Sequence, residues 1–280
     1  MEKAIKRYFP IFVLPTMIAF TLGFIIPFVE GVYLSFCKFT TVNDAKFVGF
    51  ANYAKVFTDE TFVHAFWYTA AFTVVSVILI NVLAFAVALL LTKGFKGTNI
   101  FRTVFFMPNL IGGIVLGYIW QLLLNGILMK FSRTLTYSST YGFWGLIILM
   151  CWQQIGYMMI IYIAGIQNIP GELIEAAEID GATKWQILKK VTIPMVMPSI
   201  TVCTFLTLTN SFKLFDQNLA LTNGEPSKMS EMLALNIFNT CYGRTGSEGV
   251  GQAKAVIFFI LVTVIALTQN YLTRRKEVQQ

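Results

Sequence analysis

Charged residues are scarce in this chain of 280 residues, at 12% against 56% apolar residues. Soluble domains carry roughly 25% charged residues, so the composition argues for a membrane protein. Histidine occurs once, and the four cysteines, Cys37, Cys151, Cys203 and Cys241, form no C-x-x-C pair. That pattern argues against a metal or redox site, and no nucleophile constellation stands out. We therefore expect no catalytic, metal-binding or cofactor-binding residues.

A phosphate-binding loop and a nucleic-acid surface are also missing. The sequence contains no G-x-x-x-x-G-K-[ST] stretch, so it cannot cradle ATP phosphates by that route. The net charge is +7, yet lysine and arginine lie beside long apolar runs instead of forming a basic patch with interleaved aromatics. Beside such runs they orient membrane helices, and no nucleic-acid partner is expected.

Long apolar runs are what the sequence has in abundance. A bilayer core of about 30 Å is crossed by roughly 20 apolar residues, and these must be helical because backbone groups cannot stay unpaired in lipid. The first run follows basic residues as a secretory signal does, but it is too long for one, so we expect it to be retained. The six runs extend from about Pro10 to Phe36, Phe66 to Thr92, Thr103 to Leu124, Phe143 to Gly165, Pro194 to Phe215 and Ala253 to Leu272. They predict an all-α integral membrane protein with six transmembrane helices.

The distribution of lysine and arginine predicts the orientation of these helices. Twelve lie on the side that carries both termini and nine on the other side, and those on the first side crowd close to the helix ends. The more basic side is expected to be cytoplasmic, which places both termini there. The sequence has no internal repeat or linker, so residues 1–280 are expected to form a single transmembrane domain.

The loop between the fourth and fifth runs, residues 168–193, is unusual in such an apolar chain and would face the cytoplasm. It contains "EAAEIDGATKWQILKKVTIP", from Glu175 to Pro194. Asp180 and Gly181 form a helix stop, because glycine takes a positive φ at low steric cost. Thr183 and Gln186 have the spacing of a capping box for a second helix. The sequence thus predicts two short helices joined by a sharp bend.

Two interpretations of this loop are open. Glu172, Glu175 and Glu178 recur every three residues and share one helical face, so they could simply keep the loop soluble. Alternatively the small pair Ala176 and Ala177 would let a partner approach closely. Solubility alone does not explain the alanine pair, the bend or Trp185.

The loop closely resembles the "EAA" signature of membrane subunits of binding-protein-dependent ABC importers. That signature reads E-A-A, three residues, G, nine residues, I-x-L-P. Its positions here are Glu175, Ala176, Ala177, Gly181, Val191, Ile193 and Pro194, with conservative replacements at the two aliphatic positions. "FVGFANYAKVF", "FRTVFFMPNLI" and "SFKLFDQNLALTNGEP" are similar to further stretches of the carbohydrate branch, so the resemblance covers nearly the whole chain. Gly224-Glu225-Pro226 departs from the usual Gly-Gly-Pro.

The resemblance implies a type I ABC importer permease fold, with a core five-helix region over about residues 66–272. It also implies that residues 168–193 form a coupling loop that seats in a cytoplasmic ATPase subunit. The coupling residues would be Glu175, Ala176, Ala177, Asp180, Gly181, Trp185 and Pro194. ATP and Mg²⁺ would be bound by that ATPase dimer and not by this chain. The other implied partners are a second, homologous permease subunit and an extracytoplasmic sugar-binding protein, in the cell membrane of a prokaryote.

Polar residues at membrane depth are candidates for the cargo pathway. In the resembled importers, the helices that flank the coupling loop line the cavity. The candidates on those two helices are Gln153, Gln154, Tyr157, Thr207, Asn210 and Ser211. Such side chains also join helices by hydrogen bonds, so a packing role stays open for each. The expected cargo is a sugar, with an oligosaccharide or glycerol 3-phosphate both open.

An ATP-independent secondary transporter or channel for a small polar solute is the alternative function. It predicts paired buried ionisable residues along an ion path. The sequence offers only three candidates for such a path, all toward the outer ends of the apolar runs: Glu30, Lys213 and Asp216.

Overall fold

The computed structural model describes residues 2–94, 96–243 and 245–274. Within it the chain divides into two compact units, which we describe separately. The first unit comprises Met1–Glu60 and Ile237–Ile260, and the second comprises Thr61–Asn236 and Leu261–Gln280. Three helices continue from one unit into the other or begin at the division, so the bounds below are those of whole elements.

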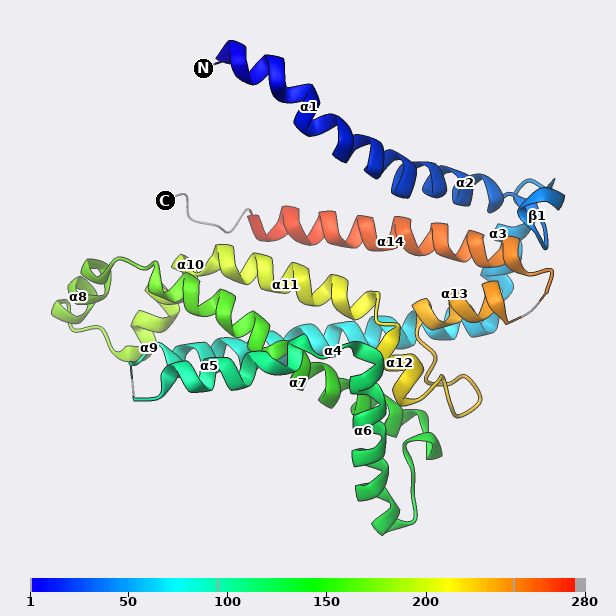
Figure 1. Cartoon of the computed structure of the whole chain (residues 1–280). Helices are drawn as coiled ribbons and strands as arrows, with labels where there is room; N and C mark the ends of the chain where they lie inside the picture. The colour runs from blue at the N-terminus through cyan, green and yellow to red at the C-terminus, as the bar shows by residue number, and fades with distance from the viewer. Residues whose placement is uncertain (1, 95, 244, 275–280) are drawn as a thin grey trace. The chain divides into compact units, whose positions relative to one another are not determined.

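The first unit is built from helices and one small hairpin (Figure 1). Its elements are α1 (Glu2–Phe20), a π-helical turn (Thr21–Ile25), α2 (Ile26–Leu34), β1 (Cys37–Lys38), a 3₁₀ turn (Val42–Asp44), β2 (Lys46–Phe47) and α3 (Ala51–Thr58). The last residues of α13 (Leu233–Tyr242) and the first half of α14 (Glu248–Arg274) complete it. Strands β1 and β2 pair antiparallel, Cys37 with Phe47.

Helices dominate the second unit, and its described residues contain no strand (Figure 1). Its principal helices are α4 (Glu60–Leu91), α5 (Thr98–Phe106), α6 (Gly113–Leu128), α7 (Ser139–Gln167), α8 (Gly171–Ile179), α9 (Lys184–Ile187), α10 (Ile193–Met195), α11 (Met197–Phe212) and α12 (Asp216–Leu221). Short helical turns lie among them, namely 3₁₀ turns at Met107–Leu110, Met129–Phe131 and Leu135–Tyr137 and a π-helical turn at Leu188–Thr192.

By length and composition, five helical segments of the described chain could cross a membrane, or six when one bent pair is counted as a span. The five are Ile11–Leu34, Glu60–Leu91, Gly113–Phe131, Ser139–Gln167 and Glu248–Thr273, and the bent pair is Lys184–Met195 with Met197–Phe212. The prediction of an all-α membrane fold is confirmed, and the first, second, fourth and sixth runs are found close to their expected positions. The cytoplasmic side of the helices stays a prediction.

The third expected span is wrong as a continuous helix over Thr103–Leu124. Helix α5 ends at Phe106, a 3₁₀ turn follows, and α6 begins only at Gly113. Pro108 cannot donate a backbone hydrogen bond, and Gly112 has an extended conformation, with φ −60° and ψ 140°. The break therefore separates a short entry helix from the shorter span Gly113–Phe131.

The fifth expected span does not begin at Pro194. Helix runs on from Lys184 through Pro194 to Met195, and the break falls at Val196, where the axis bends by 69°. Pro198 explains the position of the bend, because its ring lacks an N–H and clashes with the carbonyl four residues earlier. Helix α11 then ends at Phe212, three residues before the expected end.

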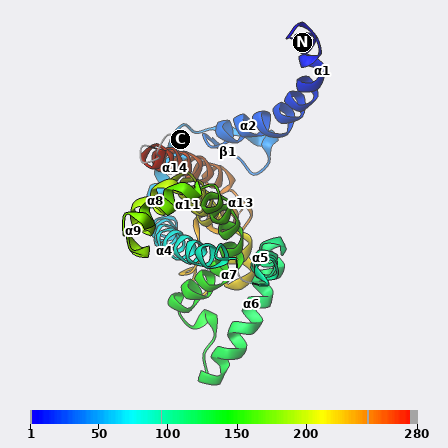
Figure 2. The same cartoon turned by 90° about the vertical axis from the view of Figure 1, so that its left-hand side faces the viewer.

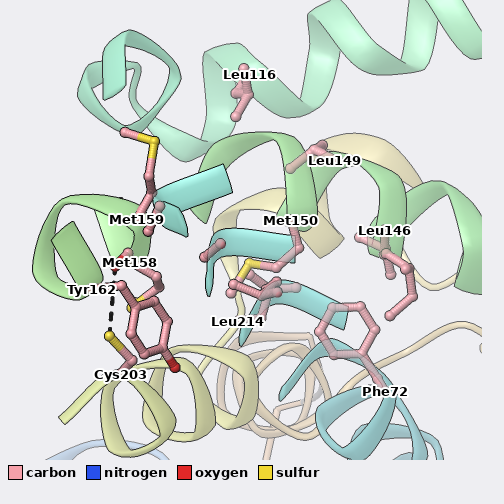
Figure 3. Packing of buried hydrophobic residues seen from close by; sticks show 14 of the residues in the cluster. Phe72, Leu116, Leu146, Leu149, Met150, Met158, Met159, Tyr162, Cys203 and Leu214 are labelled. Atoms are coloured by element: carbon pink, nitrogen blue, oxygen red, sulfur yellow. Dashed lines mark hydrogen bonds between the residues drawn. The ribbon is translucent and has the colours of Figure 1, made fainter. Parts of the chain in front are cut away.

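The core of the second unit is an apolar cluster shared by α4, α7 and α11. Phe72, Leu146, Met158, Tyr162 and Cys203 belong to it and are nearly inaccessible to solvent (Figure 3). All three helices contribute residues to that cluster, and Figure 2 views them from the end where α8 and α9 lie.

Glycines allow close crossings between helices of the second unit. A Cβ on Gly117 of α6 would lie 2.5 Å from the Cβ of Ala220 in α12. A Cβ on Gly156 of α7 would lie 1.7 Å from the carbonyl oxygen of Phe105 in α5. Contacts this short require the absence of a side chain, as at small-residue interfaces between membrane helices.

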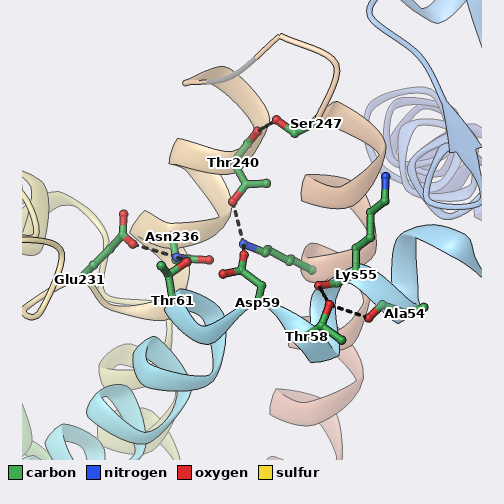
Figure 4. Close-up of polar contacts among 10 residues, drawn as sticks. Ala54, Lys55, Thr58, Asp59, Thr61, Glu231, Asn236, Thr240 and Ser247 are labelled. Carbon is green, nitrogen blue, oxygen red and sulfur yellow. Dashed lines mark hydrogen bonds and ion pairs between the residues drawn. The ribbon is translucent and has the colours of Figure 1, made fainter.

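An ion pair holds the first unit together. The Lys254 ammonium lies 2.7 Å from a carboxylate oxygen of Asp59 and donates to the Thr240 hydroxyl at 2.8 Å (Figure 4). Lys254 is 1% exposed, whereas Asp59 is 30% exposed. Nearby, the Asn52 amide donates to the carbonyls of Ser35 and Cys37 and so fixes α3 against the hairpin.

Candidate functional site

Helices α8 and α9 project at the end of the second unit, beyond the ends of α7 and α10 (Figure 1). The turn between them has the hydrogen bonds of a Schellman motif. The Ala182 N–H donates to the Ala177 carbonyl at 3.0 Å, and the Gly181 N–H donates to the Glu178 carbonyl at 3.0 Å. Gly181 has φ +77°, the left-handed conformation that this motif requires. The predicted stop at Asp180-Gly181 is therefore confirmed.

The start of α9 is also as predicted. The Gln186 N–H donates to the Thr183 hydroxyl oxygen at 3.4 Å, and the Thr183 N–H donates to the Gln186 side-chain oxygen at 2.7 Å. This reciprocal capping box begins the second short helix. A π-helical turn, Leu188–Thr192, then joins α9 to α10, which contains the half-buried Pro194. The segment from Lys184 to Met195 is thus one helical arm.

The two short helices carry exposed residues that combine one acid with apolar side chains. We call Glu175, Ala176, Ile179 and Trp185 the α8–α9 surface. All four are exposed, Ile179 by 86% and Trp185 by 69%. Ile179 was not among the residues predicted from the sequence, although it lies one helical turn after Glu175.

The opposite side of the same loop is anchored. Ile169 and Ile187 are buried, and Ile174 packs against the core cluster. The loop is therefore docked on its own unit by one face and open on the other. Exposed aromatic and aliphatic side chains beside carboxylates suit a partner surface with an apolar cleft and basic groups. The remaining predicted coupling residues differ in exposure, since Asp180 and Gly181 are exposed and Ala177 is half-buried.

A hollow lies between α7, the end of α11 and the start of α12. Its volume is about 240 Å³. We call it the amide hollow, and its lining residues are Met150, Gln154, Asn210, Lys213, Leu214, Phe215, Asp216 and Gln217. The structure thus brings together two of the predicted pathway residues, Gln154 and Asn210.

Polar groups of the amide hollow are available for a ligand. The Gln154 side-chain oxygen is buried and has no hydrogen-bond partner among the residues that the structure describes. Lys213 and Asp216 are exposed. Amides donate and accept hydrogen bonds, a carboxylate accepts and an ammonium donates, so the lining matches the hydroxyl groups of a polar, uncharged solute.

Gln217 is a polar lining residue that the sequence analysis missed. It follows the fifth span in the stretch "SFKLFDQ", where a second amide close to Asn210 is the signal that could have found it. Its amide donates to the Gln153 side-chain oxygen at 2.8 Å. Gln153 in turn donates to the Ile111 carbonyl at 3.3 Å, so this predicted pathway residue links three parts of the unit.

The other predicted pathway residues do not line the amide hollow. Thr207 is fully buried, donates to the Cys203 carbonyl at 2.7 Å and accepts from the Asn81 amide at 3.3 Å. Asn81 also accepts from the Tyr162 hydroxyl at 2.7 Å, which completes a polar link between α4, α7 and α11. Ser211 is fully buried too.

Tyr157 is half-buried, packs against the core cluster and has its ring centroid 6.5 Å from that of Phe106. Within the described residues, no three His, Cys, Asp or Glu side chains gather as metal ligands would.

Comparison with known proteins places residues 80–278 in a match to the family of "Binding-protein-dependent transport system inner membrane component". The chain is 42% identical to a probable permease of a transport system for starch degradation products in Thermoanaerobacterium thermosulfurigenes, over 96% of this chain and 94% of that one. It is 29% identical to a permease of the multiple sugar-binding transport system of Streptococcus mutans, over 99% of each. It is 28% identical to a trehalose/maltose transport permease of Thermococcus litoralis, over 89% of this chain and 88% of that one.

Two solved structures show the same fold. A bacterial ABC transporter that imports the acidic polysaccharide alginate contains a chain that matches with a TM-score of 0.81 and 23% identity, over 98% of each chain. The MetNI methionine ABC transporter in an inward-facing conformation contains a chain that matches with a TM-score of 0.58 and 21% identity. That match covers 77% of this chain and 96% of the other.

Proposed function

This chain belongs to the family of inner membrane components of binding-protein-dependent transport systems. We propose that it is a permease subunit of an ATP-driven sugar importer, and that the sugar is an oligosaccharide. It is a multi-pass protein of the prokaryotic cell membrane. The proposed partners are a second, homologous permease subunit, a cytoplasmic ATPase dimer that binds ATP and Mg²⁺, and an extracytoplasmic sugar-binding protein. The whole chain acts as one permease domain, with both termini and residues 168–193 in the cytoplasm.

The observation that carries the proposal is the α8–α9 surface. It lies on the loop between α7 and α11, and both of these helices also line the amide hollow. A displacement of this surface by a partner would therefore move the two helices that carry Gln154 and Asn210. The loop is covalently joined to both helices. Helix α7 ends at Gln167, just before the loop, and the arm Lys184–Met195 continues into α11 across the bend at Val196.

The mechanism follows from this arrangement. Glu175 meets basic groups of the ATPase, while Ile179 and Trp185 enter an apolar part of its cleft. When the ATPase dimer closes on ATP, the loop is displaced as one body, since its Schellman turn and capping box hold α8 and α9 in a fixed relation. The displacement rocks α7 and α11 and opens the amide hollow to one side of the membrane or the other, as in rigid-body switches.

The cargo assignment rests on the relatives and on the amide hollow. The relatives transport starch degradation products, multiple sugars, and trehalose or maltose, as their names state. The side-chain amides of Gln154, Asn210 and Gln217 offer both donors and acceptors to sugar hydroxyls. We propose that the pathway residues predicted from the sequence divide into cargo contacts, Gln154 and Asn210, and residues that hold the pathway's shape, among them Gln153, Tyr157, Thr207 and Ser211.

Reconstitution in vesicles tests this function. The complete transporter should take up a labelled maltooligosaccharide only with ATP and the binding protein, and omission of the ATPase subunit should abolish uptake. Uptake that persists without the ATPase and follows an ion gradient would instead establish the ATP-independent carrier.

A further inference from the structure

Two hollows of the second unit meet at Arg102 of α5 and Gln167 at the end of α7. The first, which we call the loop hollow, has a volume of about 450 Å³ and is formed by the connection between α4 and α5 and the first turn of α5, including Thr92, Gly97 and Asn99. The second, the apolar hollow, has a volume of about 350 Å³ and lies against Phe106, Ile160 and Ile163. Arg102 and Gln167 line both.

Arg102 has an unmet requirement for a hydrogen-bond acceptor. Its Nε is buried and has no partner among the residues that the structure describes. Arginine stays charged at any physiological pH, and a buried donor without an acceptor costs free energy. No aspartate or glutamate occurs anywhere in residues 61–171, which include α5, α6, α7 and nearly all of α4. The helices around Arg102 therefore hold no carboxylate that could neutralise it.

The surroundings reinforce the positive charge. Lys93 and Lys96 lie on the same connection and are exposed. Basic residues directly beside a membrane span attract anionic lipid headgroups, by about 1 kcal/mol for each residue near the surface. The local positive charge thus favours an anionic ligand. Because these basic residues lie beside a membrane span, an anionic lipid headgroup is the favoured source of that anion.

The depth of the two hollows matches the two parts of a lipid. The spans α4 and α7 end at Leu91 and Gln167, so the loop hollow lies where the membrane meets water. Ile163 and Ile160 precede Gln167 by four and seven residues, which places the apolar hollow roughly 6 to 10 Å deeper along α7. A polar opening at headgroup level continues into an apolar hollow at acyl-chain level.

We infer that this pair of hollows is a binding site for one anionic phospholipid. Its phosphate accepts hydrogen bonds from the Arg102 guanidinium and the Gln167 amide, and one acyl chain fills the apolar hollow. A free phosphate ion would leave the apolar hollow unexplained, so the lipid is the source of the anion. Because Gln167 directly precedes the loop 168–193, a bound lipid would lie beside the start of that loop.

Photocrosslinking of the assembled transporter tests the site. The probes are phosphatidylglycerol and phosphatidylcholine that carry a diazirine in the acyl chain, and adducts are mapped by peptide mass spectrometry. Phosphatidylglycerol adducts are expected on Phe106 and on residues 160–164. The Arg102→Gln variant should lower them about tenfold, as the loss of one hydrogen-bonded charge predicts. Arg133→Gln is the matched control, since Arg133 lies outside both hollows over the Tyr137 and Tyr141 rings.

A second variant keeps the test decisive if Arg102→Gln fails to assemble. Ala164 lines the apolar hollow and is exposed, so Ala164→Trp should fill that hollow and remove the adducts while Arg102 stays in place. The inference is overturned if the wild type gives no adducts at these positions, if phosphatidylcholine labels them equally, or if adducts survive in both variants. Competition by inorganic phosphate, in place of unlabelled phosphatidylglycerol, would overturn the lipid assignment as well.

Discussion

The Gln217 side-chain amide donates to the side-chain oxygen of Gln153 over 2.8 Å, which ties the first turn of α12 to the middle of α7. Gln153 is thereby turned toward the protein, whereas its neighbour Gln154 lines the amide hollow. Successive residues of a helix point about 100° apart, so two adjacent glutamines can serve different purposes. Gln153 links α7 to α12, and Gln154 lines the amide hollow.

Gln154→Leu should weaken cargo binding without loss of stability. The substitution removes a buried oxygen that has no partner among the described residues, so the melting temperature should stay the same or rise. The KM for sugar uptake should rise about three- to tenfold, the value of one net hydrogen bond. Gln153→Leu is the matched control, because it breaks two internal hydrogen bonds and should lower the melting temperature. An unchanged KM in Gln154→Leu would remove that residue from the pathway.

Thr207→Val should have the opposite signature. It removes the hydrogen bond to the Cys203 carbonyl and the acceptor for the Asn81 amide, so it should destabilise the protein by about 1 kcal/mol. The KM for sugar should not change. Thr209→Val is the control, because that hydroxyl bonds only to carbonyls of its own helix in the contacts described. Thermal unfolding and uptake kinetics measured on both variants would contradict the assignment if Thr207→Val raised KM at unchanged stability.

Gly181→Trp should insert and fold but abolish uptake. A Cβ at Gly181 meets no atom within 4 Å, so the cost within this chain is that of the positive φ, about 1–2 kcal/mol. The indole would instead obstruct docking at the neighbouring α8–α9 surface. Gly49→Trp is the matched control, since Gly49 also has a positive φ and no neighbour within 4 Å. Equal uptake by the two variants would count against a docking role for this turn.

Variants of the ion pair between Lys254 and Asp59 test whether it stabilises the fold or forms part of an ion path. Asp59→Asn should destabilise the protein by roughly 3 kcal/mol, because it removes the carboxylate that pairs with a lysine that is only 1% exposed. The double variant Asp59→Leu with Lys254→Met should recover most of that stability and retain ATP-driven uptake. Stability is read from thermal unfolding and transport from vesicle uptake. Loss of uptake in a stable double variant would favour the secondary transporter.

Hydropathy alone located the apolar runs, because lipid demands long apolar helices whatever their neighbours are. It could not locate the interruptions. Pro108 and Gly112 interrupt the third run, and the bend at Val196 displaces the start of α11, since a local backbone conformation decides where each helix ends. The bend between α8 and α9 was predictable because glycine and capping residues act within a few positions of the chain.

The candidate pathway was only partly predictable. Thr207 and Ser211 are four residues apart and so share one face of α11, but spacing does not say whether that face meets other helices or a hollow. Both residues prove fully buried, whereas Asn210 lines the amide hollow. The rotation of a helix about its own axis is set by its packing partners, which a single sequence does not show. Gln217 was missed for a different reason, since α12 follows the span and the candidates were taken from the spans alone.

Site-specific crosslinking from α8 tests the central claim most directly. A photoreactive phenylalanine placed at the exposed Ala176 of the assembled transporter should form an adduct with the ATPase subunit, strongest when ATP closes the ATPase dimer. The same group at Val42, which is exposed in the first unit, should form none. An Ala176 probe that reaches only its own chain, or that is labelled from outside the cell, would contradict the account.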